Sequence, residues 1–187
     1  MISCFDGFYF LSSFKTLCRR RFSLPAGISR GIETVGVFVN ESPSKVIETL
    51  KAVGLTTAQL HGNETPDECL QIRNQGFKVM KAFGIDAMVN WDIMEPYTQV
   101  TDRFVFDTKS DMHGGSGVKF NWALLAAYPL KHPFLLSGGI TPEDAEPLRN
   151  FKHTFCAGFD INSGFETSPA LKDINALKRF IDKIKLP

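Results

Sequence analysis

The chain has 187 residues, a formal net charge of +1 and 43% hydrophobic residues, a size that suits one domain with a substantial buried core. The near-neutral charge gives no reason to expect a nucleic acid or a membrane surface as partner, and no apolar run reaches the ~18 residues that a membrane span needs. Four widely spaced cysteines without a CxxC pair favour reduced thiols and a cytoplasmic location.

The first thirty residues differ in composition from the rest. This segment contains five basic residues, a single acidic residue, Asp6, and many serines. A basic, serine-rich and acid-poor start is typical of an organelle transit peptide, which stays open as an alternative. Our preferred interpretation is one barrel domain over residues 1–187, in which residues 1–32 are a divergent or truncated N-terminal segment.

From residue 35 onward, short apolar runs alternate with amphipathic stretches. Nearly continuous apolar runs are typical of buried parallel strands, and Ser42-Pro43 and Thr65-Pro66 are helix-start signals. In chain order, the predicted strands are 8–10, 35–39, 57–60, 78–82, 103–106, 134–136 and 154–159. The predicted helical segments are 43–53, 66 to about 76, 91–97, 122–127, 142–148 and 169–184.

Strands and helices that alternate at this spacing predict βα units around a parallel sheet. No Gly-x-Gly-x-x-Gly follows a first strand, so a dinucleotide-binding fold is not favoured. Seven predicted strands approach the eight of a closed barrel. The predicted fold class is therefore α/β, a (β/α)8 barrel of the TIM type that is incomplete at its N-terminal end.

The stretch 104–122 carries the most chemical information. The apolar run 104–106 ends at one carboxylate, Asp107, and a glycine-rich loop follows. Because active sites of such barrels lie at the carboxyl ends of the strands, Asp107 is the candidate catalytic residue. The alternative is a turn residue that ends a strand. The glycines of the loop, which can wrap a ligand, are Gly114, Gly115 and Gly117.

Two turns rich in small residues follow the last two predicted strands. Free N–H groups at such a turn beside a helix start form an anion pocket, and in these barrels the two loops commonly bind phosphate together. Either turn alone could be a tight connection without a ligand, but the pair predicts phosphate binding. The candidate residues are Ser137, Gly138 and Gly139 in the first turn and Asp160, Asn162, Ser163 and Gly164 in the second.

Gln59 and His61 end another predicted strand. They alternate with Leu60 and therefore share one face of the sheet. A histidine at such a place is more often a hydrogen-bonded structural residue than a catalyst, so both are only candidates for substrate contact. No metal-ligand spacing, Ser-His-Asp order or nucleophile elbow is visible, so no metal site is predicted.

Together these motifs resemble the phosphoribosylanthranilate isomerase family of tryptophan biosynthesis. Members of that family are (β/α)8 barrels that perform an Amadori rearrangement of N-(5-phosphoribosyl)anthranilate to an aminoketose without a cofactor. The similarity covers about residues 33–187 in the family's order. The matching pieces are 35–40, 59–64, 106–108 with 114–117 and 120–122, 136–142 and 160–166.

The resemblance also implies roles for individual residues. The family's general acid, which protonates the furanose ring oxygen, falls on Asp107, and the ribose phosphate falls on the two turns. Arg21 is the best match for the arginine that pairs with the anthranilate carboxylate, although a solvated basic run is equally compatible with the sequence. A phosphosugar is thus the expected partner, and a homodimer is left open.

The N-terminus departs from the family. The family starts with a strand that ends in Cys-Gly, whose cysteine is the general base, whereas Phe5 follows Cys4 here. Residues 7–10 look like the family's second strand, so we expect the first strand, the first helix and the base to be missing. This keeps a non-catalytic phosphosugar-binding remnant open. Another rival is an epimerase or an aldolase, for which Lys81 is the candidate Schiff-base residue.

Overall fold

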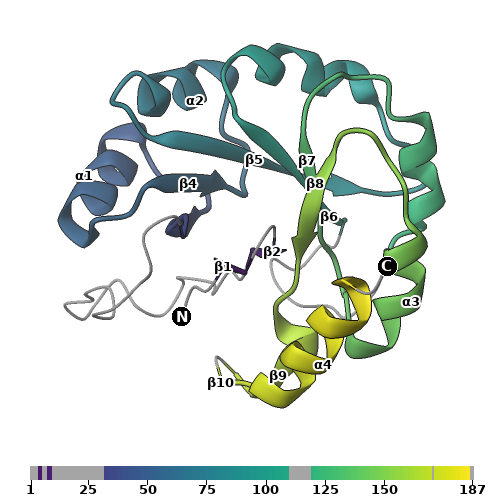
Figure 1. The fold of residues 1–187 in the computed structure, drawn as a ribbon. Coiled ribbons are helices and arrows are strands. Elements are labelled where there is room, and N and C mark those ends of the chain that lie inside the picture. Colours follow the sequence, from purple (N-terminus) through teal and green to yellow (C-terminus); the bar gives the residue numbers. More distant parts are fainter. Residues whose placement is uncertain (1–3, 6–7, 10–31, 110–118, 170, 186–187) are drawn as a thin grey trace.

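The computed structural model describes residues 4–5, 8–9, 32–109, 119–169 and 171–185. Its main sheet has the strand order β1-β2-β8-β7-β6-β5-β4-β3 (Figure 1). The strands are β1 Cys4–Phe5, β2 Phe8–Tyr9, β3 Val35–Phe38, β4 Thr57–Leu60, β5 Lys78–Ile85, β6 Arg103–Thr108, β7 Phe134–Leu136 and β8 Cys156–Asp160.

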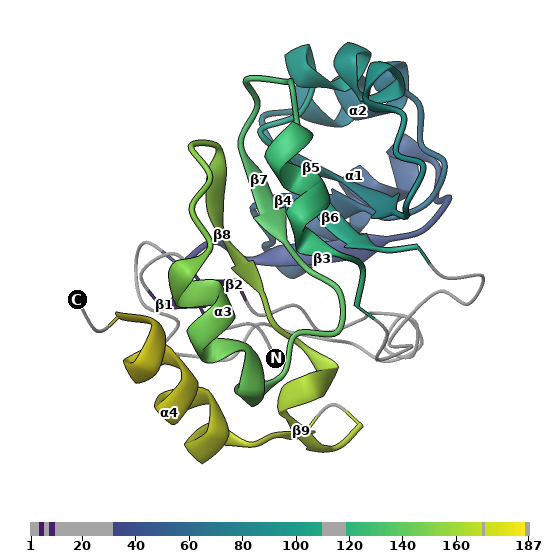
Figure 2. The same ribbon diagram turned by 90° about the vertical axis from the view of Figure 1, so that its right-hand side faces the viewer.

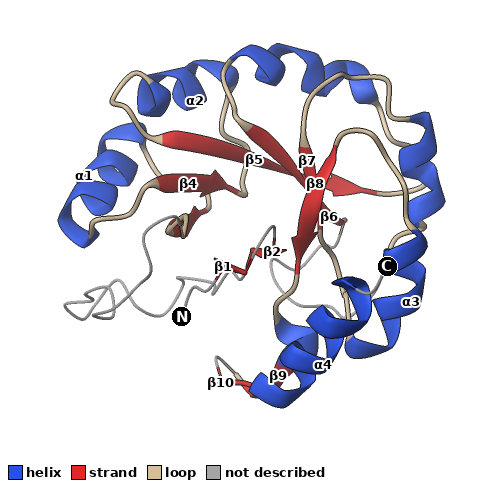
Figure 3. Cartoon of the chain, in the orientation of Figure 1, coloured by secondary structure: helices blue, strands red, loops and turns tan. Residues whose placement is uncertain are grey.

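The six strands β3 to β8 are all parallel, and each pairs with the next one along the chain. Helices or helical turns connect them on the outer side of the curved sheet, which Figure 3 shows as blue ribbons around red strands. Repeated βα units build this arrangement. The predicted strands from 35 to 159 are all present, with bounds that differ at their ends.

The connections contain four α-helices and four 3₁₀ helices among the described residues. No helix in these parts of the chain is long and apolar enough to cross a membrane. The α-helices are α1 Pro43–Val53, α2 Pro66–Arg73, α3 Ala145–Asn150 and α4 Ile174–Lys185. The 3₁₀ helices are η2 Trp91–Gln99, η3 Trp122–Ala127, η4 Pro142–Asp144 and η5 Ser163–Phe165.

Local capping explains why α2 begins and α1 ends where the sequence predicts. In α2, the Thr65 hydroxyl accepts a hydrogen bond from the Glu68 N–H at 3.3 Å, and the Glu68 carboxylate accepts one from the Thr65 N–H at 2.7 Å. This reciprocal capping box satisfies two N–H groups that a helix start otherwise leaves open. At the other end of α1, Gly54 takes a left-handed φ of 78° and its N–H bonds the Leu50 carbonyl.

The predicted start of the last helix at residue 169 is wrong. A short hairpin of β9 (Glu166–Ser168) and β10 (Leu171–Lys172) comes first, and α4 begins at Ile174. The reason is a cap, because the Asp173 carboxylate accepts a hydrogen bond from the Ala176 N–H at 2.9 Å. Leu171 is therefore 60% exposed instead of lying on the apolar face of the helix.

The strand at Phe8–Tyr9, which resembles the family's second strand, lies beside β8 in the sheet. A second barrel strand would pair with β3, but β2 pairs in parallel with β8, through Phe8–Phe159 and Tyr9–Asp160. β1 then pairs antiparallel with β2. Among the described strands, β1 and β3 are the two edges of the sheet and do not pair with each other.

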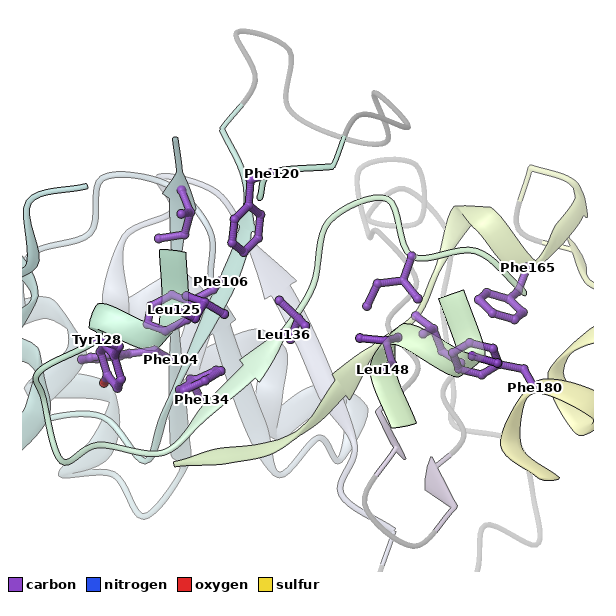
Figure 4. Close-up of a cluster of buried hydrophobic side chains, with 14 of the residues drawn as sticks. Phe104, Phe106, Phe120, Leu125, Tyr128, Phe134, Leu136, Leu148, Phe165 and Phe180 are labelled. Atoms are coloured by element: carbon purple, nitrogen blue, oxygen red, sulfur yellow. The ribbon is translucent and has the colours of Figure 1, made fainter. Parts of the chain in front are cut away.

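Apolar side chains fill both sides of the sheet. Between sheet and helices, the largest cluster includes the aromatic rings of Phe104, Phe106 and Phe134 and reaches α3 and α4, as Figure 4 shows. The α3 and α4 helices lie side by side at one end of this cluster (Figure 2). A smaller inner cluster, on the concave side, consists of Val35, Met80, Ala82, Val105 and Leu135. The inner cluster closes the floor beneath the strand ends.

We predict that Phe106→Ala lowers the free energy of unfolding by about 3–5 kcal/mol, the usual cost of truncating a buried phenylalanine. The ring is fully buried and packs against Tyr128 and Phe134 at centroid distances of 5.2 and 4.8 Å. Urea unfolding measures the change. The control is Ile93→Ala, which is 59% exposed and should change stability by less than about 0.5 kcal/mol. Equal losses in both variants would contradict this packing.

Candidate active site

Polar side chains gather at the carboxyl ends of the central strands, on the inner face of the sheet. Val105 and Leu135 belong to the inner cluster, so Asp107 and Ser137, two positions further on, point to the same side. Ala58 and Leu60 belong to the outer packing, so Gln59 and the following His61 also face inward. Because alternate residues of a strand face the same side, these polar groups lie next to the inner apolar cluster, at the carboxyl ends of the strands.

Asp107 and His61 face each other across the ends of β6 and β4. Asp107 Oδ2 lies 3.4 Å from His61 Nε2, and the side chains are 29% and 34% exposed. The other oxygen, Oδ1, accepts a hydrogen bond from the Thr108 N–H at 2.7 Å. The local bond is typical of a turn residue, but the second oxygen reaches another strand and remains partly open to solvent.

Asp160, at the end of β8, is a second carboxyl group at this mouth. Its Oδ2 accepts a hydrogen bond from the Ser137 hydroxyl at 3.0 Å, while its buried Oδ1 has no hydrogen-bond partner among the described residues. Burial and the neighbouring Asp107 raise the pKa of Asp160 to about 7, against the lowering effects of Ser137, His61 and Lys172. Asp160 therefore holds a proton well above the pH at which an exposed aspartate loses it.

The turn after β7 lies directly on the end of β6. Gly138 and Gly139 have left-handed φ values of 92° and 65°. A Cβ atom at Gly138 would come within 2.5 Å of Thr108 Oγ1 and 3.0 Å of Asp107 Oδ1. Only glycine allows both this backbone conformation and this approach, so the turn is held beside the Asp107 carboxyl.

The turn that follows β8 also lies against the turn that follows β7. A Cβ atom at Gly164 would lie 2.2 Å from the Ile140 carbonyl oxygen. Lys172 Nζ donates hydrogen bonds to Asn162 Oδ1 and Glu166 Oε1, which joins this turn to the β9–β10 hairpin. The two predicted anion-binding turns and Asp107 thus form one continuous cluster at the mouth of the sheet.

Other predicted site residues have separate outcomes. Gln59 is 2% exposed on the inner face of β4, and its Oε1 has no hydrogen-bond partner within the described part of the chain. Ser163 begins η5 next to Gly164. The remaining candidates, Arg21, Gly114, Gly115 and Gly117, lie outside the described residues.

Sequence reasoning missed the contribution of Lys172, because it placed this residue in the last helix. A lysine close to a glycine-rich turn was the available signal, but its side chain reaches Asn162 only because the hairpin turns the chain back. It also missed Glu64, whose carboxylate pairs with Lys81 of β5, a residue distant in sequence.

Lys81, the candidate Schiff-base residue of the aldolase alternative, does not face the mouth. It alternates with the inner residues Met80 and Ala82 and is 3% exposed on the other side of the sheet. Its ammonium group lies 3.3 Å from Glu64 Oε2 and donates a hydrogen bond to the Gly62 carbonyl at 2.7 Å. Burial lowers the pKa of Lys81, an effect that the Glu64 carboxylate opposes. Such an enclosed amine has no path to a sugar carbonyl.

The two cysteines in the described regions, Cys69 and Cys156, are free thiols in apolar surroundings. Burial raises the pKa of Cys69 to about 12 and also raises that of Cys156. Neither thiol is therefore a base at neutral pH. The free state of these two thiols agrees with the expectation of reduced cysteines.

Known proteins share both the sequence and this arrangement. The family model described as N-(5'phosphoribosyl)anthranilate (PRA) isomerase matches residues 24–183. The N-(5'-phosphoribosyl)anthranilate isomerase of Parabacteroides distasonis is 46% identical over 153 residues, which cover 82% of this chain and 69% of that protein.

The chain belongs to the N-(5'-phosphoribosyl)anthranilate isomerase family.

Solved structures of this family agree with the fold. A phosphoribosyl anthranilate isomerase in complex with reduced 1-(O-carboxyphenylamino)-1-deoxyribulose 5-phosphate is 31% identical with a TM-score of 0.68, over 85% of this chain and 74% of the other. Monomers of the dimeric Thermotoga maritima enzyme are 32% identical with a TM-score of 0.66, over 83% and 73%. The predicted family, barrel fold and aldose–ketose isomerase class in tryptophan biosynthesis are confirmed, and the epimerase or aldolase alternative is wrong.

We predict that Asp160→Asn changes the pH dependence of stability. Asp160 binds its proton more tightly in the folded chain, with a pKa of about 7 against the ordinary 3.8. The folded state therefore holds the extra proton between these values, and the contribution of Asp160 to stability falls as pH rises through this range. Asparagine does not titrate, so the stability of the variant relative to wild type should rise by about 1.4 kcal/mol per pH unit from pH 4 to 7. Parallel urea-unfolding profiles would contradict this.

We also predict that Gly138→Ala weakens ligand binding at the mouth, which a titration with reduced 1-(O-carboxyphenylamino)-1-deoxyribulose 5-phosphate measures. The added methyl group would meet Thr108 and Asp107, so the turn has to move away. The matched control is Gly76→Ala, because Gly76 also has a positive φ, 86°, but nothing lies within 4 Å of its Cβ position. Both variants should lose roughly 1–2 kcal/mol of stability from the backbone conformation. Equal effects on affinity would show that the contact at Gly138 is irrelevant to binding.

Proposed function

We propose that this chain converts N-(5-phosphoribosyl)anthranilate into the corresponding aminoketose, 1-(2-carboxyphenylamino)-1-deoxyribulose 5-phosphate, by an Amadori rearrangement. The observation that carries the proposal is the close approach of the turn at Gly138 to the Asp107 carboxyl, whose Oδ1 would lie 3.0 Å from a Cβ atom at position 138. It brings a proton-donating group and an anion-binding turn within a few ångströms of each other. A short phosphosugar has its phosphate and its ring oxygen at a comparable separation.

Asp107 is assigned as the general acid. It protonates the furanose ring oxygen as the C1–O bond breaks, which opens the ring to a protonated Schiff base. A general base then takes the proton on C2, and the resulting enolamine tautomerises to the aminoketose. The geometry supports this assignment because the carboxyl group is partly exposed at a strand end and has His61 within 3.4 Å as a partner for proton exchange. The proposal covers the acid and phosphate parts of the site, which lie among the described residues.

The two turns after β7 and β8 are assigned to the phosphate. The N–H groups of glycine-rich turns converge on anions in this way, and the contact of Gly164 with Ile140 makes both turns one surface. The hydroxyl group of Ser163 adds a donor, whereas that of Ser137 already donates to Asp160. Lys172 contributes positive charge close to Asn162, although Glu166 balances part of it.

Several wider predictions stay predictions. The chain is expected to take a phosphosugar substrate, because the related structure described above binds a deoxyribulose 5-phosphate derivative. The Thermotoga maritima relative is dimeric, and a homodimer of this chain is expected on that likeness. A cytoplasmic location and a single domain over residues 1–187 remain expectations from composition and length.

We predict that Asp107→Asn lowers kcat by about 10²–10⁴-fold, the usual contribution of a positioned proton donor. The affinity for reduced 1-(O-carboxyphenylamino)-1-deoxyribulose 5-phosphate should change little, because the phosphate turns stay intact. Conversion of substrate to aminoketose, followed chromatographically, and a binding titration measure the two quantities.

The control for that substitution is Asp86→Asn. Asp86 follows β5 and pairs with Lys109 at 2.6 Å, so it is another carboxylate in a loop after a strand but without contact to His61. Its replacement should leave kcat unchanged. If Asp107→Asn removes binding together with turnover while the fold is retained, Asp107 positions the ligand instead. If the unaltered chain binds the ligand but shows no turnover, the non-catalytic remnant is the correct interpretation.

A further inference from the structure

A buried ion pair lies on the outer side of the sheet, directly behind His61. Lys81 and Glu64 are both 3% exposed, and Lys81 Nζ lies 3.3 Å from Glu64 Oε2. Burying two charges is costly unless further hydrogen bonds satisfy them. The remaining partners of this pair therefore show what it is used for.

The partners of Lys81 are backbone carbonyls on both sides of His61. Its ammonium group donates hydrogen bonds to the carbonyls of Leu60 at 3.3 Å and Gly62 at 2.7 Å, and to that of Ala82 at 3.1 Å. His61 is the residue between the first two of these. A single buried cation thus fixes the backbone immediately before and after the histidine.

Glu64 binds the same turn from the other side of the ion pair. Its Oε2 accepts the Gly62 N–H at 2.9 Å, and its Oε1 accepts the Asn40 N–H at 2.7 Å. Asn40 Oδ1 in turn accepts the Asn63 N–H at 2.7 Å. A Cβ atom at Gly62 would lie 2.3 Å from Asn40 Oδ1, so the loop after β3 presses on the turn that follows β4.

We propose that Lys81 and Glu64 are positioning residues, which hold His61 at the distance from Asp107 that the proton transfer needs. They touch neither the mouth nor a ligand, and they act through the backbone at positions 60–62. The proposal rests on the proposed function, because it names the groups that set the position of His61 relative to the proposed acid, Asp107. Of the five backbone groups that the pair binds, three belong to Leu60 and Gly62, the residues on either side of His61.

A second ion-pair cluster provides the matched control. Glu33 also binds two cations from neighbouring strands, Lys78 at 2.6 Å and Arg103 at 2.7 Å. Lys78 and Arg103 are the first residues of β5 and β6, so this cluster lies at the opposite end of the sheet from the mouth. It connects strands in the same way but has no path to His61.

The experiment measures how strongly the ring of His61 senses Asp107, by NMR of the four histidines in the full chain. The His61 signal is assigned by its loss in His61→Asn. Asp107→Asn is then introduced into wild type, into Lys81→Met/Glu64→Gln, and into the control Arg103→Met/Glu33→Gln. Each double replacement removes one carboxylate and one cation, so that no buried charge is left unpaired. Lys78, the cation that stays in the control, is 55% exposed.

In wild type and in the control background, Asp107→Asn should shift the His61 ring signal. In Lys81→Met/Glu64→Gln the shift should be lost, although the chain remains folded. An unchanged shift in that background, or an equal loss in the control, would overturn the proposal and leave the pair a purely structural role. If the double variant does not fold, Glu64→Gln is compared with Glu33→Gln, since each removes one carboxylate from its cations. Only Glu64→Gln should weaken the shift, because the one oxygen of glutamine cannot accept from both the Gly62 and the Asn40 N–H.

This measurement needs no turnover, so failure of the proposed function and failure of the positioning role give different results. In turnover measurements, removal of the Lys81–Glu64 pair should slow the chemical step. Lys81→Met/Glu64→Gln should lower kcat at least about tenfold, within the contribution of general acid–base catalysis, with little change in KM. A rise in KM at constant kcat would contradict a role in positioning the acid.

Discussion

The close approach of the turn after β7 to the end of β6 is the contact on which the rest of the site depends. It requires a residue without a side chain at position 138, because a methyl group there would overlap Thr108 and crowd Asp107. Once the turn is seated, Ser137 reaches Asp160 and the next turn packs against Ile140. The proposed proton donor, Asp107, and the proposed anion-binding turns are therefore neighbours.

The two faces of the sheet carry different kinds of side chain. The outer face packs aromatic and aliphatic side chains against the helices and supplies most of the apolar burial. The inner face is apolar only at its floor and becomes polar at the carboxyl ends of the strands. Strand periodicity makes this division possible, because one residue more or less moves a side chain to the opposite face. Lys81 and Glu64 are a buried ion pair behind the mouth, on the face that packs mainly apolar side chains.

Much of the fold could be predicted because its signals are local. Apolar runs gave the strands, and the caps at Ser42 and Thr65 gave the starts of two helices. The start of α4 could not be predicted from periodicity, because the apolar spacing of Leu171 continues through the hairpin while the cap lies at Asp173. The neighbour of β2 was also missed, since strand pairing is decided by which sheet edge is available rather than by composition.

The candidate site follows the same division between local and distant signals. Asp107 and the glycine turns were visible because each lies at the end of a strand. The Lys81–Glu64 pair was not, because it joins residues from different strands and depends on which face each side chain takes. From the sequence, Lys81 was a candidate only for the Schiff-base residue of the aldolase alternative, whereas its burial and its backbone partners support the proposed role behind His61.

The central claim is that the Asp107 carboxyl and the two turns bind one phosphosugar together. A crystal structure of this chain with reduced 1-(O-carboxyphenylamino)-1-deoxyribulose 5-phosphate tests it most directly. The account predicts the phosphate on the backbone N–H groups of the turns at 138–139 and 163–164, with Asp107 within hydrogen-bond distance of the sugar chain. A phosphate bound elsewhere, or an Asp107 side chain turned away from the ligand, would contradict it.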